Sequence, residues 1–350
     1  MTIGVTRQAL PTVTGFAVKC AIAALQARNI AEGPLLHRAG LTEFELDNSR
    51  RRVTAAAQGE FLETAAQALS DAAFGLHLAE QANPREAGLV FYVVSAAGNL
   101  GEALRLFARY CRIVNESVRL KLAPRPDGMI VEANFSGVSR HRIRQNVEFQ
   151  FAVVVKALRE IAGLRVSPIR VTFAHGRTTD VKEFERFYGC PVEFGAMFDH
   201  LAFANETVAL PLITEDPHLL ETLRPFCEEA ARARNTAVGS MRAAVENEVQ
   251  RLLPHGHAQA ESVAKALAVS SRTLSRRLSE EGTSFAEVVE GLRRSLAAQY
   301  LNESGFTLGQ IGWLLGYEGP TSFNHAFKRW TGRSPSVARN EMRAPAPGWT

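Results

Sequence analysis

A short helical pattern occurs twice in the last third of the chain, and this repeat constrains the fold more than any other feature of the sequence. The first copy is an apolar helical face that is interrupted and then resumes at Leu274 and Leu278. The second copy ends in the same way on Phe323 and Phe327, 49 positions later. Two short helices joined by a tight turn are typical of a helix-turn-helix. One such match arises readily by chance, whereas two indicate a duplicated binding element.

The two copies differ in length only at the turn. Leu315 lies 48 positions after Leu267, while Phe323 lies 49 positions after Leu274. The second turn therefore contains one extra residue, which the glycines and the proline in that turn can accommodate. This interpretation predicts one all-α domain that contains two helix-turn-helix units.

Residues 284–301 between the two copies are predicted to form a single helix. Thr283 or Ser284 can cap its first turn, with Glu287 behind the cap. Such a helix is about 25 Å long. Successive major grooves on one side of a DNA duplex lie about 34 Å apart, so a helix of this length can place two recognition helices in both grooves.

Helical geometry predicts which side chains would face a duplex. If the leucines of the first copy and the phenylalanines of the second point inward, residues two positions earlier point outward. We expect Arg272 and Arg276 to read bases, because arginine can donate two hydrogen bonds to guanine. Thr321 and His325 are the corresponding residues of the second copy. The flanking residues Ser275 and Asn324 are predicted to assist base reading. The residues predicted to contact phosphates are Arg277, Lys328, Arg329 and Arg333.

The N-terminal two thirds of the chain have a different pattern, which predicts an α+β domain of helices and a small, mostly antiparallel sheet. Residues 117–122 alternate apolar and polar side chains, and an Asp-Gly turn separates them from a second predicted strand at 129–135, as in a β-hairpin. The further predicted helices are 60–78, 100–113, 147–158 and 179–188, and the further predicted strands are 168–174, 192–194 and 201–203.

The change of pattern predicts a domain boundary near residue 238. We expect a ligand-sensing or dimerisation domain in residues 1–238, a DNA-binding domain in 239–343 and a frayed tail in 344–350. Residues 240–350 contain 13 Lys and Arg against 10 Asp and Glu, so most of the net charge of +4 lies there. This excess is modest support for a nucleic-acid partner.

Composition excludes several other classes of protein. The chain is 46% hydrophobic and 22% charged, unlike a disordered segment. No apolar run is long enough to span a membrane, and the N-terminus lacks the pattern of a signal peptide. The four cysteines are isolated, as expected in a reducing cytoplasm. His255 and His257 are the only close histidine pair, and we predict neither a metal site nor a cofactor.

The C-terminal residues resemble the DNA-binding domain of the AraC/XylS family of bacterial transcription regulators. The resemblance rests on residues 311–317 (IGWLLGY), on Phe323, Phe327 and Lys328, and on residues 332–335 (GRSP) with Arg339. More loosely, residues 98–110 and 184–194 resemble the arabinose-binding-type sensor domain of the family branch that includes ornithine-utilisation regulators. This second resemblance implies a domain that senses a small-molecule effector and is compatible with a homodimer. It identifies neither the ligand nor the residues that bind it.

Three functions follow from these patterns. The first is a ligand-responsive transcription regulator that binds double-stranded DNA and, as an activator, contacts RNA polymerase. The second is a constitutive DNA-binding protein whose N-terminal domain only dimerises. The third is an enzyme fused to a DNA-binding module, which is disfavoured because the sequence contains no GxxxxGK[ST], GxGxxG, HExxH or GxSxG motif.

Overall fold

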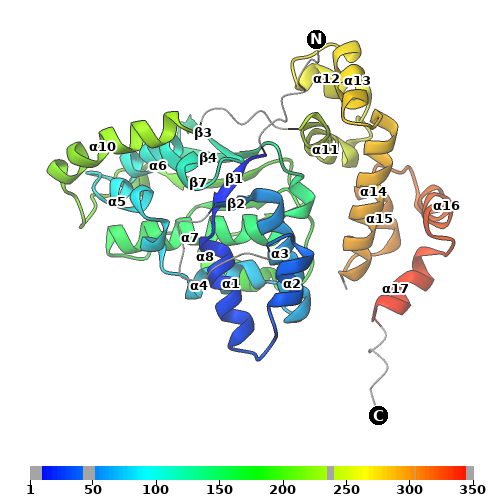
Figure 1. The fold of residues 1–350 in the computed structure, drawn as a ribbon, viewed down its shortest axis with the longest axis horizontal. Coiled ribbons are helices and arrows are strands. Elements are labelled where there is room, and N and C mark those ends of the chain that lie inside the picture. Colours follow the sequence, from blue (N-terminus) through cyan, green and yellow to red (C-terminus); the bar gives the residue numbers. More distant parts are fainter. Residues whose placement is uncertain (1–9, 42–51, 235–239, 304, 344–350) are drawn as a thin grey trace, which may run out of the picture. The chain divides into compact units, whose positions relative to one another are not determined.

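The computed structural model of the chain describes residues 10–41, 52–234, 240–303 and 305–343 (Figure 1). The chain forms two compact units that divide between Ser240 and Met241, and the segment Gly176–Thr179 groups with the second unit. The predicted boundary at residue 238 and the predicted tail 344–350 lie outside the described residues. Among the helices of the described ranges, none has both the length and the apolar character that crossing a bilayer requires.

The N-terminal unit combines helices with two antiparallel or mostly antiparallel sheets, so the predicted α+β class is confirmed. Its α-helices are α1 (Phe16–Gln26), α2 (Gly33–Arg38), α3 (Ala55–Ala68), α4 (Phe74–Gln81), α5 (Leu89–Ser95), α6 (Leu100–Val114), α7 (Arg144–Ala162), α8 (Val181–Tyr188), α9 (Asn205–Val208) and α10 (Pro217–Arg232), with short 3₁₀ turns η1 (Pro84–Ala87) and η2 (Arg140–Arg142). Its strands are β1 (Thr12–Thr14), β2 (Arg52–Thr54), β3 (Val118–Arg125), β4 (Gly128–Phe135), β5 (Arg170–Phe173), β6 (Val192–Phe194) and β7 (Asp199–Ala204).

The larger sheet has the strand order β3-β4-β7-β5-β6. All neighbours are antiparallel except β5 and β6, which are parallel. The predicted hairpin is confirmed, with Val118 opposite Phe135 and Arg125 opposite Gly128. A Cβ atom at Gly128 would lie 1.8 Å from the carbonyl oxygen of Phe203 on β7, so only glycine fits where these strands meet.

The prediction of one continuous helix over residues 60–78 is wrong, because a turn between α3 and α4 interrupts the helix. Ser70 adopts a left-handed conformation with φ of 51°. The Asp71 carboxylate then accepts a hydrogen bond from the Ala73 backbone N–H at 3.0 Å. An aspartate that binds the backbone two residues ahead favours a turn over a continuing helix. The small β1–β2 pair was not predicted, since strands of three residues have almost no periodicity.

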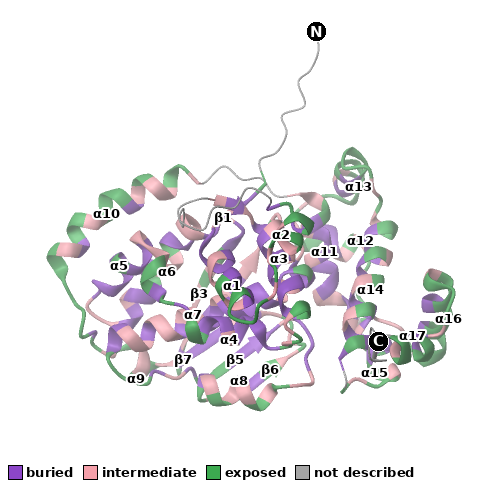
Figure 2. Ribbon diagram, turned by 60° about the horizontal axis from the view of Figure 1, so that its bottom comes forward, coloured by how far each residue is buried: buried purple, intermediate pink, exposed green. Residues whose placement is uncertain are grey.

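Helix α7 covers one face of the larger sheet. Its Phe151 ring lies 5.4 Å from Phe173 of β5. Phe173 in turn stacks on Phe194 of β6 at 5.1 Å and contacts Phe184 of α8 at 6.1 Å. Figure 2 shows buried residues concentrated on these central strands and on the helices next to them. The sheet, α7 and α8 therefore share one hydrophobic core.

A buried network of charged and polar side chains joins the sheet to α7 and η2. Arg140 donates to both carboxylate oxygens of Asp199 at 2.6 Å, in a bidentate pair. His175 Nδ1 lies 2.9 Å from the same guanidinium, and its Nε2 lies 2.6 Å from Glu148. Because Arg140 can only donate, His175 Nδ1 accepts, so the neutral ring carries its proton on Nε2 and donates it to Glu148. All four residues are at most 4% exposed.

The charge state of His175 predicts an acid-sensitive N-terminal unit. Burial lowers the pKa of His175 from 6.5 to about 4, and the Arg140 guanidinium acts in the same direction. A histidine that is neutral when folded contributes stability that is present above 6.5 and is lost as the pH falls toward 4. The pKa difference corresponds to about 3 kcal/mol of unfolding free energy. Urea unfolding followed by circular dichroism between pH 7.5 and 4.5 measures this loss, which His175→Gln should reduce.

His77 is the control, because its pKa is shifted in the direction opposite to that of His175. Hydrogen bonding to Asp71 raises the pKa of His77 to about 9. Its contribution is therefore complete below pH 6.5 and is lost as the pH rises from 6.5 to about 9. His77→Gln should leave the loss between pH 6.5 and 4.5 unchanged. A His175 resonance that titrates near 6.5 in the folded protein would contradict the prediction.

The C-terminal unit is entirely helical within its described residues. Its elements are α11 (Met241–Leu252), the 3₁₀ turn η3 (Leu253–His255), α12 (Ala260–Ala266), α13 (Ser271–Glu280), α14 (Phe285–Asn302), α15 (Leu308–Leu314), α16 (Pro320–Thr331) and α17 (Pro335–Arg343). These helices enclose a second hydrophobic core, separate from that of the N-terminal unit.

Candidate nucleic-acid interface

The first helix-turn-helix consists of α12 and α13. Ser270 caps α13, because its hydroxyl accepts a hydrogen bond from the Thr273 backbone N–H at 3.1 Å. Leu274 and Leu278 are fully buried, at 0% exposure. The predicted inward face of this recognition helix is therefore confirmed, and the residues two positions earlier lie on the outer face.

The second helix-turn-helix consists of α15 and α16. Thr307 and Gln310 form a capping box at the start of α15. Gly319 is the N-cap of α16 and Pro320 is its first residue, where a proline fits without loss of a hydrogen bond. Phe323 and Phe327 are 0% and 4% exposed. The inward face is again confirmed.

The two turns use different residues at equivalent positions. Ala268 follows α12 with φ of 53°, and Gly316 follows α15 with φ of 74°. These positions are 48 residues apart, the same offset as that of the preceding leucines. Glycine adopts this left-handed conformation freely, whereas alanine is strained in it by about 1–2 kcal/mol. The first unit thus carries strain that the second lacks.

Ala268→Gly is therefore expected to stabilise the C-terminal unit by about 1 kcal/mol. Urea unfolding followed by tryptophan fluorescence measures this gain, because all three tryptophans lie between residues 313 and 349. Ala266→Gly is the matched control, since Ala266 is an exposed residue within α12. It should destabilise the unit by about 0.5–1 kcal/mol. Equal effects of both substitutions would contradict the strain at Ala268.

Helix α14 runs between the two helix-turn-helix units (Figure 1). Ser284 and Glu287 form the capping box at its start, as predicted. Near its middle, Arg293 donates to the carbonyl oxygen of Leu315 at 3.0 Å and lies over the Tyr317 ring, which fixes the second turn. Both units and α14 belong to the same hydrophobic core. The spacing of the two recognition helices is therefore set by packing and does not depend on a flexible linker.

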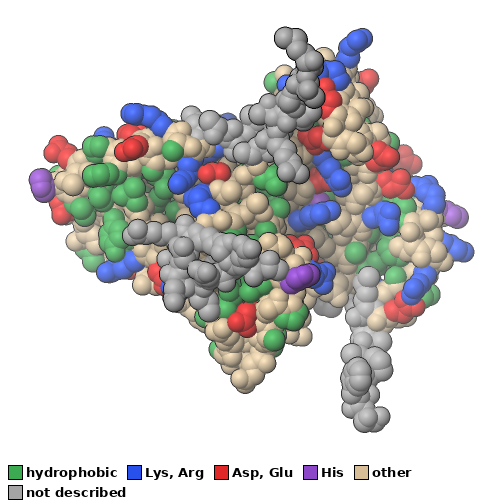
Figure 3. All heavy atoms as spheres, in the orientation of Figure 1, with side chains coloured by type: hydrophobic (Ala, Val, Ile, Leu, Met, Phe, Trp, Pro, Cys, Tyr) green, Lys and Arg blue, Asp and Glu red, His purple; other side chains and the backbone are tan. Residues whose placement is uncertain are grey.

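All ten residues predicted to contact DNA are exposed on the C-terminal unit. They are Arg272, Ser275, Arg276 and Arg277 on α13, Thr321, Asn324, His325, Lys328 and Arg329 on α16, and Arg333 before α17. Figure 3 shows Lys, Arg and His side chains on the surface over α16. This exposure is compatible with the predicted contacts but does not test them.

Three of these cations also have acidic neighbours. Arg276 lies 2.8 Å from Glu280, Arg329 lies 3.3 Å from Glu290, and Arg333 pairs with Glu341. Each pair is exposed and is worth at most about 1 kcal/mol. A phosphate or a guanine could therefore replace these carboxylates at little cost.

The positions of two residues near this surface, Trp313 and Glu290, were not predicted from the sequence. The helical spacing of Trp313 is compatible with a core position, but its side chain on α15 is 56% exposed. Ile311 and Leu315, two positions before and after Trp313, are fully buried. The tryptophan therefore lies on the opposite, exposed side of the helix. Glu290 on α14 was not singled out, yet it accepts a hydrogen bond from Trp330 Nε1 at 2.6 Å and anchors α16.

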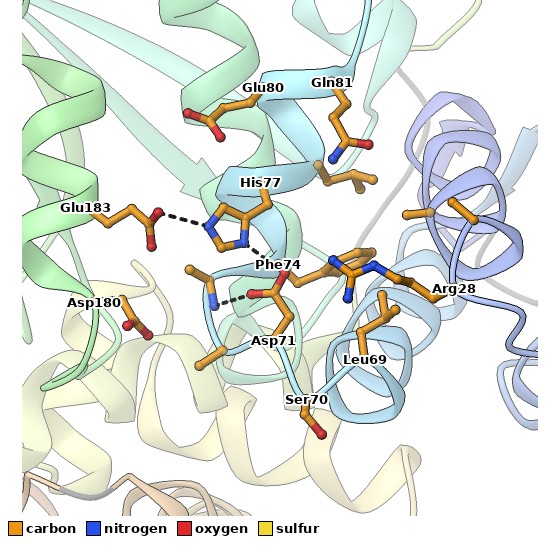
Figure 4. A pocket seen from close by; sticks show the side chains of 15 residues that line it. Arg28, Leu69, Ser70, Asp71, Phe74, His77, Glu80, Gln81, Asp180 and Glu183 are labelled. Atoms are coloured by element: carbon orange, nitrogen blue, oxygen red, sulfur yellow. Dashed lines mark hydrogen bonds and ion pairs between the residues drawn. The ribbon is translucent and has the colours of Figure 1, made fainter.

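The N-terminal unit contains a polar surface hollow of about 540 Å³, shown in Figure 4. His77 on α4 stands at its centre, 2.8 Å from Asp71 and 3.2 Å from Glu183 on α8. Because the pKa of His77 is raised, the ring is cationic at neutral pH and links α4 to α8 as an ion triad. Among the described residues, no group of His, Cys, Asp and Glu has the arrangement of a metal site.

Comparison with known families matches both units. Residues 30–212 match the model for the arabinose-binding N-terminal domain of AraC transcription regulators, and residues 263–341 match a helix-turn-helix domain model.

Individual relatives are regulators of the same kind. The chain is 28% identical to the ornithine utilization regulator of Pseudomonas aeruginosa, over 78% of this chain and 80% of that protein. It is 27% identical to the HTH-type transcriptional regulator VirS of Mycobacterium tuberculosis, over 79% of this chain and 82% of that one. Among solved structures, the transcriptional regulator CdpR of Pseudomonas aeruginosa is 22% identical with a TM-score of 0.45, covering 93% of this chain and 98% of that chain.

Proposed function

Since the chain belongs to the AraC family of transcription regulators, whose arabinose-binding-type domain model covers residues 30–212, we propose how it binds and responds. It is a sequence-specific regulator that inserts α13 and α16 into two successive major grooves. The observation that carries this proposal is the pair of exposed recognition helices held on one core by α14. We assign residues 239–343 to DNA binding and residues 1–238 to sensing.

Each recognition helix has a defined role in this proposal. Arg272 and Arg276, with help from Ser275, read bases from α13. Thr321, Asn324 and His325 read bases from α16. The cations near the edges of this surface fix the register by contacting phosphates, and they are Arg277, Lys328, Arg329 and Arg333.

The N-terminal unit is proposed to control this activity. A small-molecule effector that binds one conformation better than another shifts the fraction of DNA-competent protein. As an activator, the protein would contact RNA polymerase, and the N-terminal unit would support a homodimer. We place it in the cytoplasm and assign no catalytic step to it, because the relatives that it matches are regulators.

Footprinting of the purified chain on its own upstream DNA tests the proposal. We expect two protected segments on one face of the duplex, one helical turn apart, and affinity that falls steeply with salt. Protection of a single groove would contradict the use of both units. Absence of any complex at low salt would contradict DNA binding itself.

A thermal-shift screen of metabolites separates a sensor from a passive dimerisation domain. A ligand present at 100 times its dissociation constant adds about 2.7 kcal/mol to stability. Ligand-dependent stabilisation that also changes the footprint supports effector control. A regulator whose footprint no metabolite alters would be constitutive.

A further inference from the structure

A second, apolar hollow lies inside the N-terminal unit, between β1, α1, α6 and α7. Its volume is about 110 Å³. Phe16, Phe149 and Val153 are among its apolar walls. A smaller hollow of about 30 Å³ adjoins it, because Phe107, Val118, Gln150 and Val154 line both. None of the described residues that line either hollow carries a charge.

Three buried carboxamides line this hollow, and each keeps a polar atom without a partner among the described residues. Asn115 at the end of α6 is 6% exposed, Gln58 on α3 is 4% exposed and Asn146 on α7 is 1% exposed. The unpartnered atoms are Asn115 Nδ2, Gln58 Oε1 and Asn146 Nδ2. A buried polar group without a partner costs about 1–3 kcal/mol of folding free energy. Three such groups around one cavity therefore call for an explanation, such as a ligand that hydrogen-bonds to them.

The roles of these amides follow from their other hydrogen bonds. Asn115 Oδ1 accepts from the backbone N–H of Ser117 at 2.9 Å and from its hydroxyl at 2.6 Å, so Nδ2 remains as a donor. Gln58 Nε2 donates to Asn146 Oδ1 at 2.9 Å. If both amides of that pair were flipped, they would still leave one donor and one acceptor. The three amides therefore supply donors and an acceptor to a lining that is otherwise apolar apart from Thr14 and Gln150.

We propose that this hollow is a binding site for a small uncharged molecule with an apolar body and one hydroxyl or amide group. An engineered cavity of about 150 Å³ in another protein holds benzene, so a body of about one six-membered ring fits here together with the adjoining space. The hydroxyl or amide would donate to the glutamine and accept from the asparagines. A charged ligand is excluded because no described lining residue could neutralise it.

The polar hollow around His77 does not compete with this assignment. Its central charges are already paired with one another, and among the described residues that line it none has a buried polar atom without a partner. Backbone pairing and a hydrogen bond also connect the lining of the apolar hollow to neighbouring elements of the unit. Asn115 forms an isolated bridge with Val13, and Arg52 of β2 donates to the carbonyl oxygen of Ile113 at 2.8 Å. A ligand there would contact β1, α6 and α7 together, and β1 pairs with β2.

Phenol and toluene are matched probes for this site, since they differ only in the hydroxyl that replaces a methyl group. Calorimetric titration of the full chain at pH 7 should give one site for phenol, with an affinity at least ten-fold higher than that for toluene. Benzoate, which is charged at this pH, should bind at least ten-fold more weakly than phenol. Equal affinity for phenol and toluene, or stronger binding of benzoate, would overturn the proposal.

Two substitutions locate the site. Gln58→Met removes the acceptor and keeps the length of the side chain, so phenol binding should fall about ten-fold while toluene binding changes by less than three-fold. Val154→Phe fills the hollow and should abolish binding of both probes. Gln81→Met is the control, because Gln81 is an exposed residue of α4 away from this hollow. Phenol binding that survives Val154→Phe in a folded protein would place the site elsewhere.

We infer that this hollow binds the effector, and this assignment rests on the proposed regulation. The binding of a small uncharged molecule to the hollow does not depend on that function. Binding of the probes is measured without DNA. Failure of the titration therefore rejects the site and leaves DNA binding intact, whereas failure of the footprint leaves the site intact.

Discussion

Replacing Asp199 with asparagine is expected to lower the unfolding free energy of the N-terminal unit by about 3–5 kcal/mol. The substitution keeps the shape of the side chain but leaves the guanidinium of Arg140 buried at 4% exposure without its bidentate partner. It also weakens the acceptor for the backbone N–H of Ala174, which donates to Asp199 Oδ1 at 2.8 Å in the unsubstituted protein. Because His175 contacts the same guanidinium, the loss extends to α7 through Glu148.

The neighbouring strand provides the control for this prediction. Glu193 of β6 pairs with Arg170 of β5 at 2.9 Å, but these side chains are 51% and 62% exposed. Glu193→Gln should therefore cost less than about 1 kcal/mol. Urea unfolding followed by circular dichroism, with hydrogen exchange in β5 and β7, measures both variants. Similar losses for the two substitutions would show that burial does not determine the cost.

The sequence predicted the C-terminal unit well because its signals are local. Capping residues such as Ser270 and Ser284 act on backbone groups three residues away, and the apolar faces of the recognition helices repeat every three or four residues. The hairpin of the N-terminal unit was predictable for the same reason, because its two strands are adjacent in the chain.

The features that sequence reasoning did not find depend on contacts between distant residues. Arg140 and Asp199 are 59 positions apart, and Gln58 and Asn146 are 88 positions apart. No periodicity links such pairs, so neither the buried network nor the amide-lined hollow could be predicted. Trp313 shows the complementary limit, since helical spacing alone does not tell which apolar residue the fold leaves exposed.

Removing both arginines from the outer face of α13, as Arg272→Ala with Arg276→Ala, is expected to weaken specific DNA binding by about 2–6 kcal/mol. Each bidentate contact between arginine and guanine contributes about 1–3 kcal/mol of discrimination. The expected loss is a factor of about 30 or more in affinity for the footprinted site. The ion pair of Arg276 with Glu280 offsets little of this, because both side chains are more than half exposed. Titration of fluorescent duplexes, one specific and one of random sequence, measures the effect.

Arg277→Ala distinguishes base reading from simple loss of positive charge, because Arg277 is exposed on the same helix and is proposed to contact phosphate. This variant should weaken specific and random duplexes equally, and should reduce the slope of log affinity against log salt by about 1. The double variant, by contrast, should lose far more affinity for the specific duplex than for the random one. The fold would be unaffected in both variants, since all three arginine side chains are exposed. If the double variant lost equal affinity for both duplexes, Arg272 and Arg276 would be phosphate contacts, and sequence recognition would have to come from α16.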